Sequence, residues 1–114
     1  MKSSSKNCGL VLMKKYKLII TPDAKADVAS ILKYLDMFSH SISSRYSTYI
    51  YDSINSLSHM PKRCTLVRDE DLREKGYRWM SVRNFTVFFI VDDNAAIVRI
   101  ERVLYSKREY DVIL

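Results

Sequence analysis

Cationic and aromatic side chains alternate through the second half of the chain, and these are the residues whose types could do chemistry. Arginine and lysine neutralise phosphates, and aromatic rings stack on unpaired bases, so the combination suits single-stranded nucleic acid. The alternative is that the rings lie in the core and the charges are solvated or paired with nearby acids. The cations and rings in question are Arg73, Lys75, Tyr77, Arg78, Trp79, Arg83, Arg99, Arg102, Tyr105, Lys107, Arg108 and Tyr110.

Other catalytic or ligand-binding patterns are absent from the sequence. No glycine-rich phosphate loop, zinc-binding spacing or nucleophile elbow occurs. His40 and His59 lie at the two ends of one expected helix, about 28 Å apart, and cannot share a metal ion or a proton. Neither Cys8 nor Cys64 has a base near it in the sequence. We therefore expect no metal site and no cofactor.

The length and composition fit one compact soluble domain. The chain has 114 residues, of which 47% are hydrophobic and 28% charged. Its longest apolar runs are too short to cross a bilayer, so no membrane association is expected. Two cysteines make no disulfide framework, which favours the reducing cytoplasm. Lys and Arg number 19 against 13 Asp and Glu, and the resulting charge of +6 favours nucleic acid or an acidic protein as a partner.

The first half predicts a strand followed by two helices. Residues 15–21 are rich in β-branched and aromatic side chains, and Thr21 and Pro22 then form a helix start. Apolar residues at helical spacing predict helices over residues 22–38 and 42–59, joined as a hairpin. Residues 1–13 contain an apolar stretch too short for a secretory signal. They are interpreted as a disordered extension before a single domain at 14–114.

The second half predicts three strands. Residues 62–76 are charged and irregular, and alternating segments follow at 77–83, 85–92 and 96–105, separated by short turns. The order β-α-α-β-β-β indicates an α+β fold, an antiparallel sheet with the αα-hairpin packed on one face. Both alternating sets of residues 85–92 are largely apolar, so the sequence does not decide which set faces the helices.

Three segments resemble the RelE/ParE superfamily of bacterial toxins over residues 14–114. They are the opening YKLIITPDAKADV, the central block GYRWMSVRNFTVFFIVD, and the ending VLYSKREY. The resemblance implies a small cytoplasmic toxin held inactive by a co-expressed antitoxin, with which it could form a hetero-oligomer. It agrees with the element order read from the sequence alone.

The superfamily holds two activities, which the resemblance assigns to different residues. RelE-like members cleave mRNA on the ribosome with basic residues on the second strand, an arginine on the third, and an arginine plus a tyrosine or histidine near the end. Arg78 and Arg108 match two of these positions. Met80, Thr86 and the terminal Leu114 depart from the other three.

The resemblance therefore favours a ParE-like inhibitor of DNA gyrase, which needs no such catalytic set. The alternatives are a RelE-like endoribonuclease, with Arg78 and Arg108 as catalytic residues, and an inactive relic that only binds its antitoxin. Whether the protein is an enzyme is left open. Residues expected to bind a partner or nucleic acid are Arg83, Arg99, Arg102, Lys107 and Tyr110.

Overall fold

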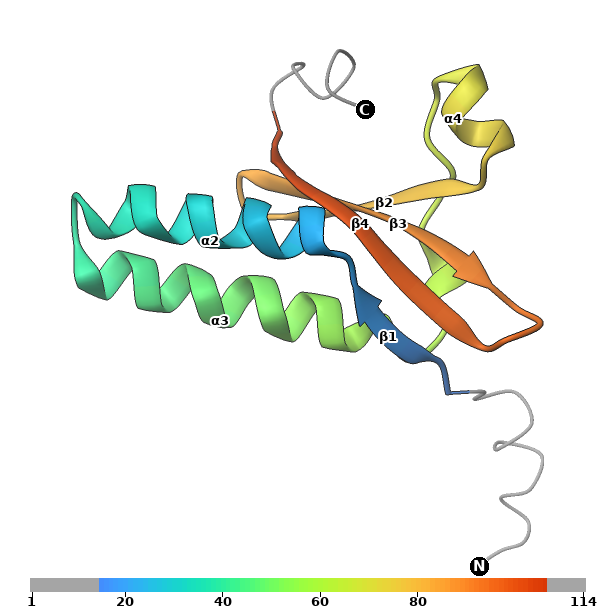
Figure 1. Cartoon of the computed structure of the whole chain (residues 1–114), viewed down its shortest axis with the longest axis horizontal. Coiled ribbons are helices and arrows are strands. Elements are labelled where there is room, and N and C mark those ends of the chain that lie inside the picture. The colour runs from blue at the N-terminus through green and yellow to red at the C-terminus, as the bar shows by residue number, and fades with distance from the viewer. Residues whose placement is uncertain (1–14, 107–114) are drawn as a thin grey trace, which may run out of the picture.

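A computed structural model describes residues 15–106 of the chain. The strand β1 (Lys17–Ile20) leads into the helices α2 (Pro22–Asp36) and α3 (His40–Ser56), which form the expected hairpin (Figure 1). A 3-10 turn η1 (Pro61–Arg63) and a short helix α4 (Glu70–Glu74) precede the strands β2 (Tyr77–Val82), β3 (Phe85–Asp92) and β4 (Ile97–Tyr105). The predicted α+β class and β-α-α-β-β-β order are confirmed, and η1 and α4 are additions to the segment expected to be irregular.

The helices begin at side chains that satisfy their first backbone donors. Thr21 accepts a hydrogen bond from the Ala24 amide, as its position before Pro22 predicts, and Pro22 occupies the first turn. Ser39 caps α3 in the same way by accepting from the Ile42 amide. The helix α3 therefore begins at His40, two residues before the predicted start.

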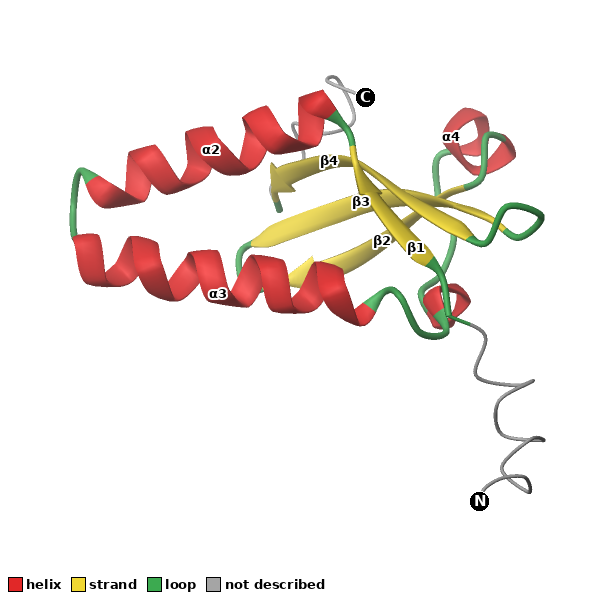
Figure 2. Cartoon of the chain, turned by 60° about the horizontal axis from the view of Figure 1, so that its bottom comes forward, coloured by secondary structure: helices red, strands yellow, loops and turns green. Residues whose placement is uncertain are grey.

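The four strands form one sheet in the order β1-β4-β3-β2. The predicted antiparallel meander is confirmed for β2, β3 and β4, whereas β1 pairs in parallel with β4 at the other edge. Residues of α2 and α3 pack together with one face of this sheet in the core, and Figure 2 shows the two helices running side by side. The hairpin extends beyond the strands at the α2–α3 turn.

The structure decides which set of β3 residues meets the helices. Phe85, Val87 and Phe89 belong to the core cluster that includes Val28 and Ile50 of the hairpin. The intervening Thr86, Phe88 and Ile90 therefore point to the opposite side, which we call the distal face of the sheet. Within residues 15–106, no helix is long and apolar enough to cross a membrane.

Candidate functional site

The distal face carries a cavity of about 410 Å³ between α4 and the strands β2 and β3. Trp79 and Phe88 line it with aromatic surface, and Ser81, Thr86 and Ser106 line it with hydroxyls. The strand register explains this grouping, because Trp79 lies opposite Phe88 and Ser81 lies opposite Thr86. Arg68 and Asp69 complete the wall from the segment before α4.

The polar groups in this cavity are partly engaged with one another. The hydroxyls of Thr86 and Ser106 lie 2.9 Å apart, and the Asp69 carboxylate accepts the amide of Leu72 as the cap of α4. Thr86 is buried, whereas Trp79 is 42% exposed. The site thus offers an aromatic surface and hydroxyl groups, with Arg68 as its lining cation.

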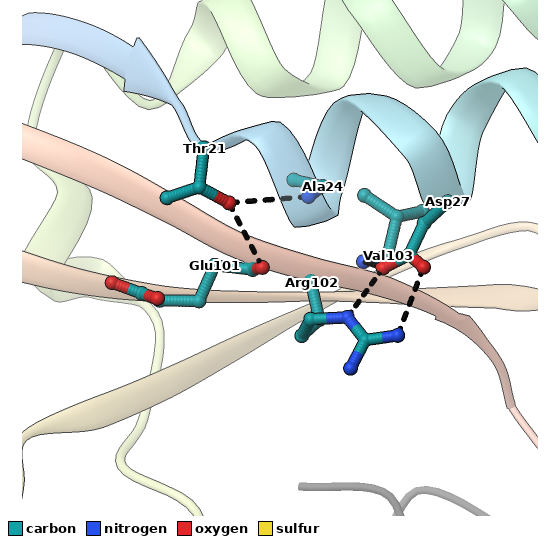
Figure 3. A network of polar contacts seen from close by, with 6 residues as sticks. All are labelled: Thr21, Ala24, Asp27, Glu101, Arg102 and Val103. Atoms are coloured by element: carbon teal, nitrogen blue, oxygen red, sulfur yellow. Dashed lines mark hydrogen bonds and ion pairs between the residues drawn. The ribbon is translucent and has the colours of Figure 1, made fainter.

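Two arginines expected to bind a partner project from β4 next to this face, and each is paired within the chain. Arg99 forms an ion pair with Glu101. Arg102 holds Asp27 of α2 through two hydrogen bonds of 2.7 and 2.9 Å (Figure 3). The hydrogen bonds that Arg102 donates to Asp27 raise the pKa of Arg102, and the bond that Arg99 donates to Glu101 raises the pKa of Arg99. Both arginines are therefore fixed cations beside fixed anions.

Asp27 has a second function that sequence reasoning missed. Since β1 pairs with β4 only as far as Ile100, the outer edge of β4 continues without a strand beside it. The Asp27 carboxylate accepts the amide of Val103, and the Thr21 hydroxyl donates to the carbonyl of Glu101 (Figure 3). The start of α2 therefore replaces the missing strand. Asp27 and Val103 are 76 positions apart, and no local pattern indicates their contact.

A bulge in β4 makes this arrangement compatible with the core. Phe88 pairs with Arg102 and the adjacent Phe89 pairs with Ile100, so Glu101 is the extra residue. Ile100 and Val103, three positions apart, can then both lie in the core. Without the extra residue, strict alternation would turn one of them away from the helices.

Arg78, the candidate catalytic residue of β2, lies on the other side of the sheet. It pairs with the core residue Phe89 and therefore points to the hairpin face, opposite to the face that carries Thr86. Its guanidinium donates a 2.7 Å hydrogen bond to the carbonyl of Cys64. The structure does not bring Arg78 together with the cavity of the distal face.

Arg83 is placed at the turn between β2 and β3. Its backbone φ is +57°, a conformation unfavourable for a side chain larger than glycine, and its guanidinium lies 3.9 Å from the centre of the Tyr49 ring. Its side chain is exposed. Arg83 lies at the turn end of the β2–β3 pair, whereas Arg78 lies near the other end of β2. Lys107, Arg108 and Tyr110, the other expected site residues, lie outside the described residues.

The histidines and the described cysteine form no catalytic group in this structure. His40 contacts Asp36 at 2.8 Å on the surface, and His59 contacts the hydroxyl of Ser58. Burial raises the pKa of the Cys64 thiol more than the nearby Arg63 and Arg78 lower it, which opposes formation of a thiolate. Within residues 15–106, no three His, Cys, Asp or Glu side chains come together as metal ligands would.

Comparison with known proteins gives a family and a fold. Residues 18–110 match the sequence profile of the ParE toxin of the type II toxin–antitoxin system parDE. None of the curated proteins compared with the chain matches it.

Two solved structures share the fold at low sequence identity. One is the chromosomal ParDE toxin–antitoxin system of P. aeruginosa, with 18% identity and a TM-score of 0.67, covering 82% of this chain and 99% of that one. The other is the toxin–antitoxin complex RelBE2 of Mycobacterium tuberculosis, with 20% identity and a TM-score of 0.57, covering 80% and 98%.

Proposed function

Because the chain belongs to the ParE toxin family of type II toxin–antitoxin systems, we propose that it arrests growth by binding and inhibiting DNA gyrase. We further propose that a cognate antitoxin neutralises it, as expected for a toxin whose structural neighbours were solved as toxin–antitoxin systems. The proposed place of action is the cytoplasm, where gyrase works.

The observation that carries this proposal is the commitment of the sheet arginines to partners inside the chain. RNA cleavage needs a base for the 2′-hydroxyl, cations for the developing phosphorane charge, and an acid for the leaving oxygen. Arg78 lies on the face opposite to Thr86, while Arg99 and Arg102 are each held beside a carboxylate. Among the described residues, the distal cavity is lined by one cation, Arg68, and by the carboxylate of Asp69, which already caps α4. Inhibition by binding needs no catalytic set.

Two parallel assays test the proposal. Purified protein is added to gyrase with relaxed plasmid, and separately to ribosomes programmed with mRNA. We expect supercoiling to be inhibited and the mRNA to stay intact. Ribosome-dependent mRNA cleavage with normal supercoiling would instead establish the ribonuclease activity. Inactivity in both assays, with antitoxin binding retained, would identify an inactive relic.

Two arginine substitutions, one of them a control, make this test more specific. Arg78→Ala should leave gyrase inhibition within a few-fold of the wild type, because the side chain serves the carbonyl of Cys64 and not a reacting group. A ribonuclease that used Arg78 to neutralise transition-state charge would lose about 10²–10³ in rate. Arg73→Ala, which also removes a hydrogen bond to a backbone carbonyl, that of Val67, is the matched control for any structural effect.

A further inference from the structure

One corner of the molecule, where β1 begins and η1 follows α3, carries the surplus positive charge of the described residues. Residues 15–106 contain 14 Lys and Arg against 11 Asp and Glu. Five of these cations and two of these acids lie at this corner, so the remaining nine cations and nine acids balance. What we call the basic corner consists of Lys15, Lys17, Lys62, Arg63 and Arg78 with the acids Asp92 and Asp93.

Contacts between distant segments bring these residues together. Lys15 forms an antiparallel bridge with His59, which lies between α3 and η1. Asp93, in the turn after β3, accepts the phenol of Tyr16 at 2.6 Å and pairs with Lys62 of η1. Figures 1 and 2 show η1 beside the start of β1. The corner is therefore one continuous surface built from β1, η1 and the end of β3.

The two arginines of the corner are held by neutral groups. Arg63 donates a 2.7 Å hydrogen bond to the carbonyl of His59, and Arg78 donates likewise to a backbone carbonyl. No carboxylate offsets either guanidinium at these contacts. Asp92, next to Asp93, already accepts the amide of Ala95. The corner consequently keeps a positive potential toward solvent.

The three lysines of the corner are available to a partner. Lys15 and Lys17 are exposed, and neither belongs to an ion pair found within residues 15–106. The side chain of Lys62 is 51% exposed, and it shares its acid, Asp93, with Tyr16. Compact ammonium groups of this kind contact phosphates as point charges.

The composition of the corner favours a nucleic-acid backbone over a protein. Protein interfaces are depleted in lysine and gather aromatic side chains, and here the exposed rings of Tyr34 and Phe38 lie at the far end of the hairpin (Figure 1). Near the corner, Met60 and Leu66 are exposed but have no ring, and Tyr16 is buried. Single strands are bound largely by stacking their bases on rings, so cations without an exposed ring suit a duplex.

We propose that the basic corner binds the phosphate backbone of duplex DNA without sequence preference. Lys15, Lys17 and Lys62 contact phosphates, while Arg63 and Arg78 add attraction and keep their bonds within the chain. The preceding residues 1–14 add three lysines and no acid to the charge of this part of the sequence. The inference goes beyond the toxin function and does not depend on it, since binding is measured with DNA alone.

Fluorescence anisotropy of a labelled 20-base-pair duplex, titrated with the full chain, tests the proposal. The dissociation constant should lie between about 10 and 100 µM at 150 mM NaCl, as for other non-specific complexes. About three phosphate contacts should give a slope near −2.7 for log affinity against log salt, so the affinity should fall about 40-fold from 50 to 200 mM. A single strand of the same length should bind more weakly.

Two double variants with the same loss of charge separate the corner from the net charge. Lys15→Gln with Lys17→Gln should weaken duplex binding by about tenfold or more at 50 mM NaCl and should make the salt slope shallower by about two. Lys25→Gln with Lys33→Gln is the matched control, because both lysines are exposed on α2 away from the corner. This control should bind within about twofold of the wild type, with an unchanged slope.

Four results would overturn the proposal. The first is an anisotropy that stays constant up to about 200 µM protein at 50 mM NaCl. The second is an equal loss of binding in the two double variants, which would mean that net charge alone attracts DNA. A single strand that binds more tightly than the duplex would point to base stacking elsewhere on the chain. Poly-L-glutamate that displaces the duplex at an equal concentration of charges would assign the corner to an acidic protein instead.

Discussion

Asp27 acts at the residue scale as the link between the hairpin and the sheet. Its carboxylate is 14% exposed, pairs with Arg102, and accepts the amide of Val103 at the strand edge. Removing the acid leaves a half-buried guanidinium and a backbone amide without their partner. Removing one partner costs more free energy than the intact pair contributes to stability. The reason is that each buried group has lost its hydrogen bonds to water and is then left without a partner.

Two substitutions of Asp27 should therefore lower the free energy of unfolding by different amounts. Asp27→Ala should cost about 2–4 kcal/mol, and Asp27→Asn should cost less, because the amide oxygen can still accept from Val103. Urea denaturation measures both. Asp52→Asn, an exposed change on α3, should stay within about 0.5 kcal/mol. Equal stability of Asp27→Ala and wild type would show that the link contributes nothing.

Tyr16 gives the fold a dependence on alkaline pH. Its phenol donates a 2.6 Å hydrogen bond to Asp93, and this bond raises the pKa of Tyr16 above its usual value. The fold thus favours the protonated phenol, so the stabilisation is complete below about pH 10 and is lost as pH rises through the raised pKa. Burial raises the pKa of Tyr77 and acts in the same direction.

Tyr16→Phe should consequently be less stable than the wild type at pH 7, by about 1–3 kcal/mol. The difference in melting temperature between the two proteins should shrink above about pH 10, since the wild type loses the bond there. A series of thermal melts from pH 7 to 11 measures this. Tyr34→Phe, at an exposed ring, serves as the control that should follow the wild type throughout. A constant difference across the series would contradict the assignment.

At the scale of elements, the hairpin is held by the stripe of α3 that enters the core. Ile50 is fully buried, whereas Ile42 on the same helix is 40% exposed. Ile50→Ala should cost about 2–5 kcal/mol through lost burial and the cavity left behind. Ile42→Ala should cost under about 1 kcal/mol. Denaturant midpoints of the two variants compare them directly, and similar losses would mean that the packed side of α3 is misassigned.

The sequence predicted these elements because their signals are local. Thr21-Pro22 begins α2, helical spacing sets both stripes, and alternation identifies the three later strands. The parallel pairing of β1 with β4 joins Lys17 to Ile97, and no spacing within either segment indicates such a partner. The helix α4 is short and charged, so its pattern resembled that of a loop. Its cap Asp69 is the signal that could have located it.

The candidate site was less predictable than the fold, since it depends on which face each residue takes. Both sets of β3 are apolar enough for a core, and only the packed structure separates Phe89 from Phe88. Arg78 and Thr86 belong to adjacent strands, yet alternation and register put them on opposite faces. The bulge at Glu101 reverses the alternation of β4 and could not be read from the sequence around it.

At the scale of the whole molecule, positive charge exceeds negative charge, and Glu101 and Asp27 pair locally with Arg99 and Arg102. Arg102 is committed to Asp27, and Arg78 to a carbonyl, so neither can serve a partner without disturbing the fold. The side chain of Arg99 is 52% exposed and shares Glu101, and Arg83 and Arg68 are exposed without ion pairs among those found in residues 15–106. Long-range attraction to an acidic partner therefore depends on the net charge and on these exposed cations.

Binding of the proposed antitoxin should accordingly weaken with salt. Calorimetric titrations at about 50, 150 and 500 mM NaCl should show the affinity falling by tenfold or more, because the distance beyond which exposed charges are screened falls from about 14 Å to about 4 Å across this range. Sucrose at matched osmolality is the control and should leave the affinity unchanged. Arg68→Gln should reduce the salt dependence, because Arg68 is exposed and has no ion pair among those found in residues 15–106. Arg102→Gln should mainly lower stability, since its charge is already neutralised by Asp27. An affinity independent of salt would mean that the antitoxin binds through apolar contacts, and the exposed arginines would then have no part in its recognition.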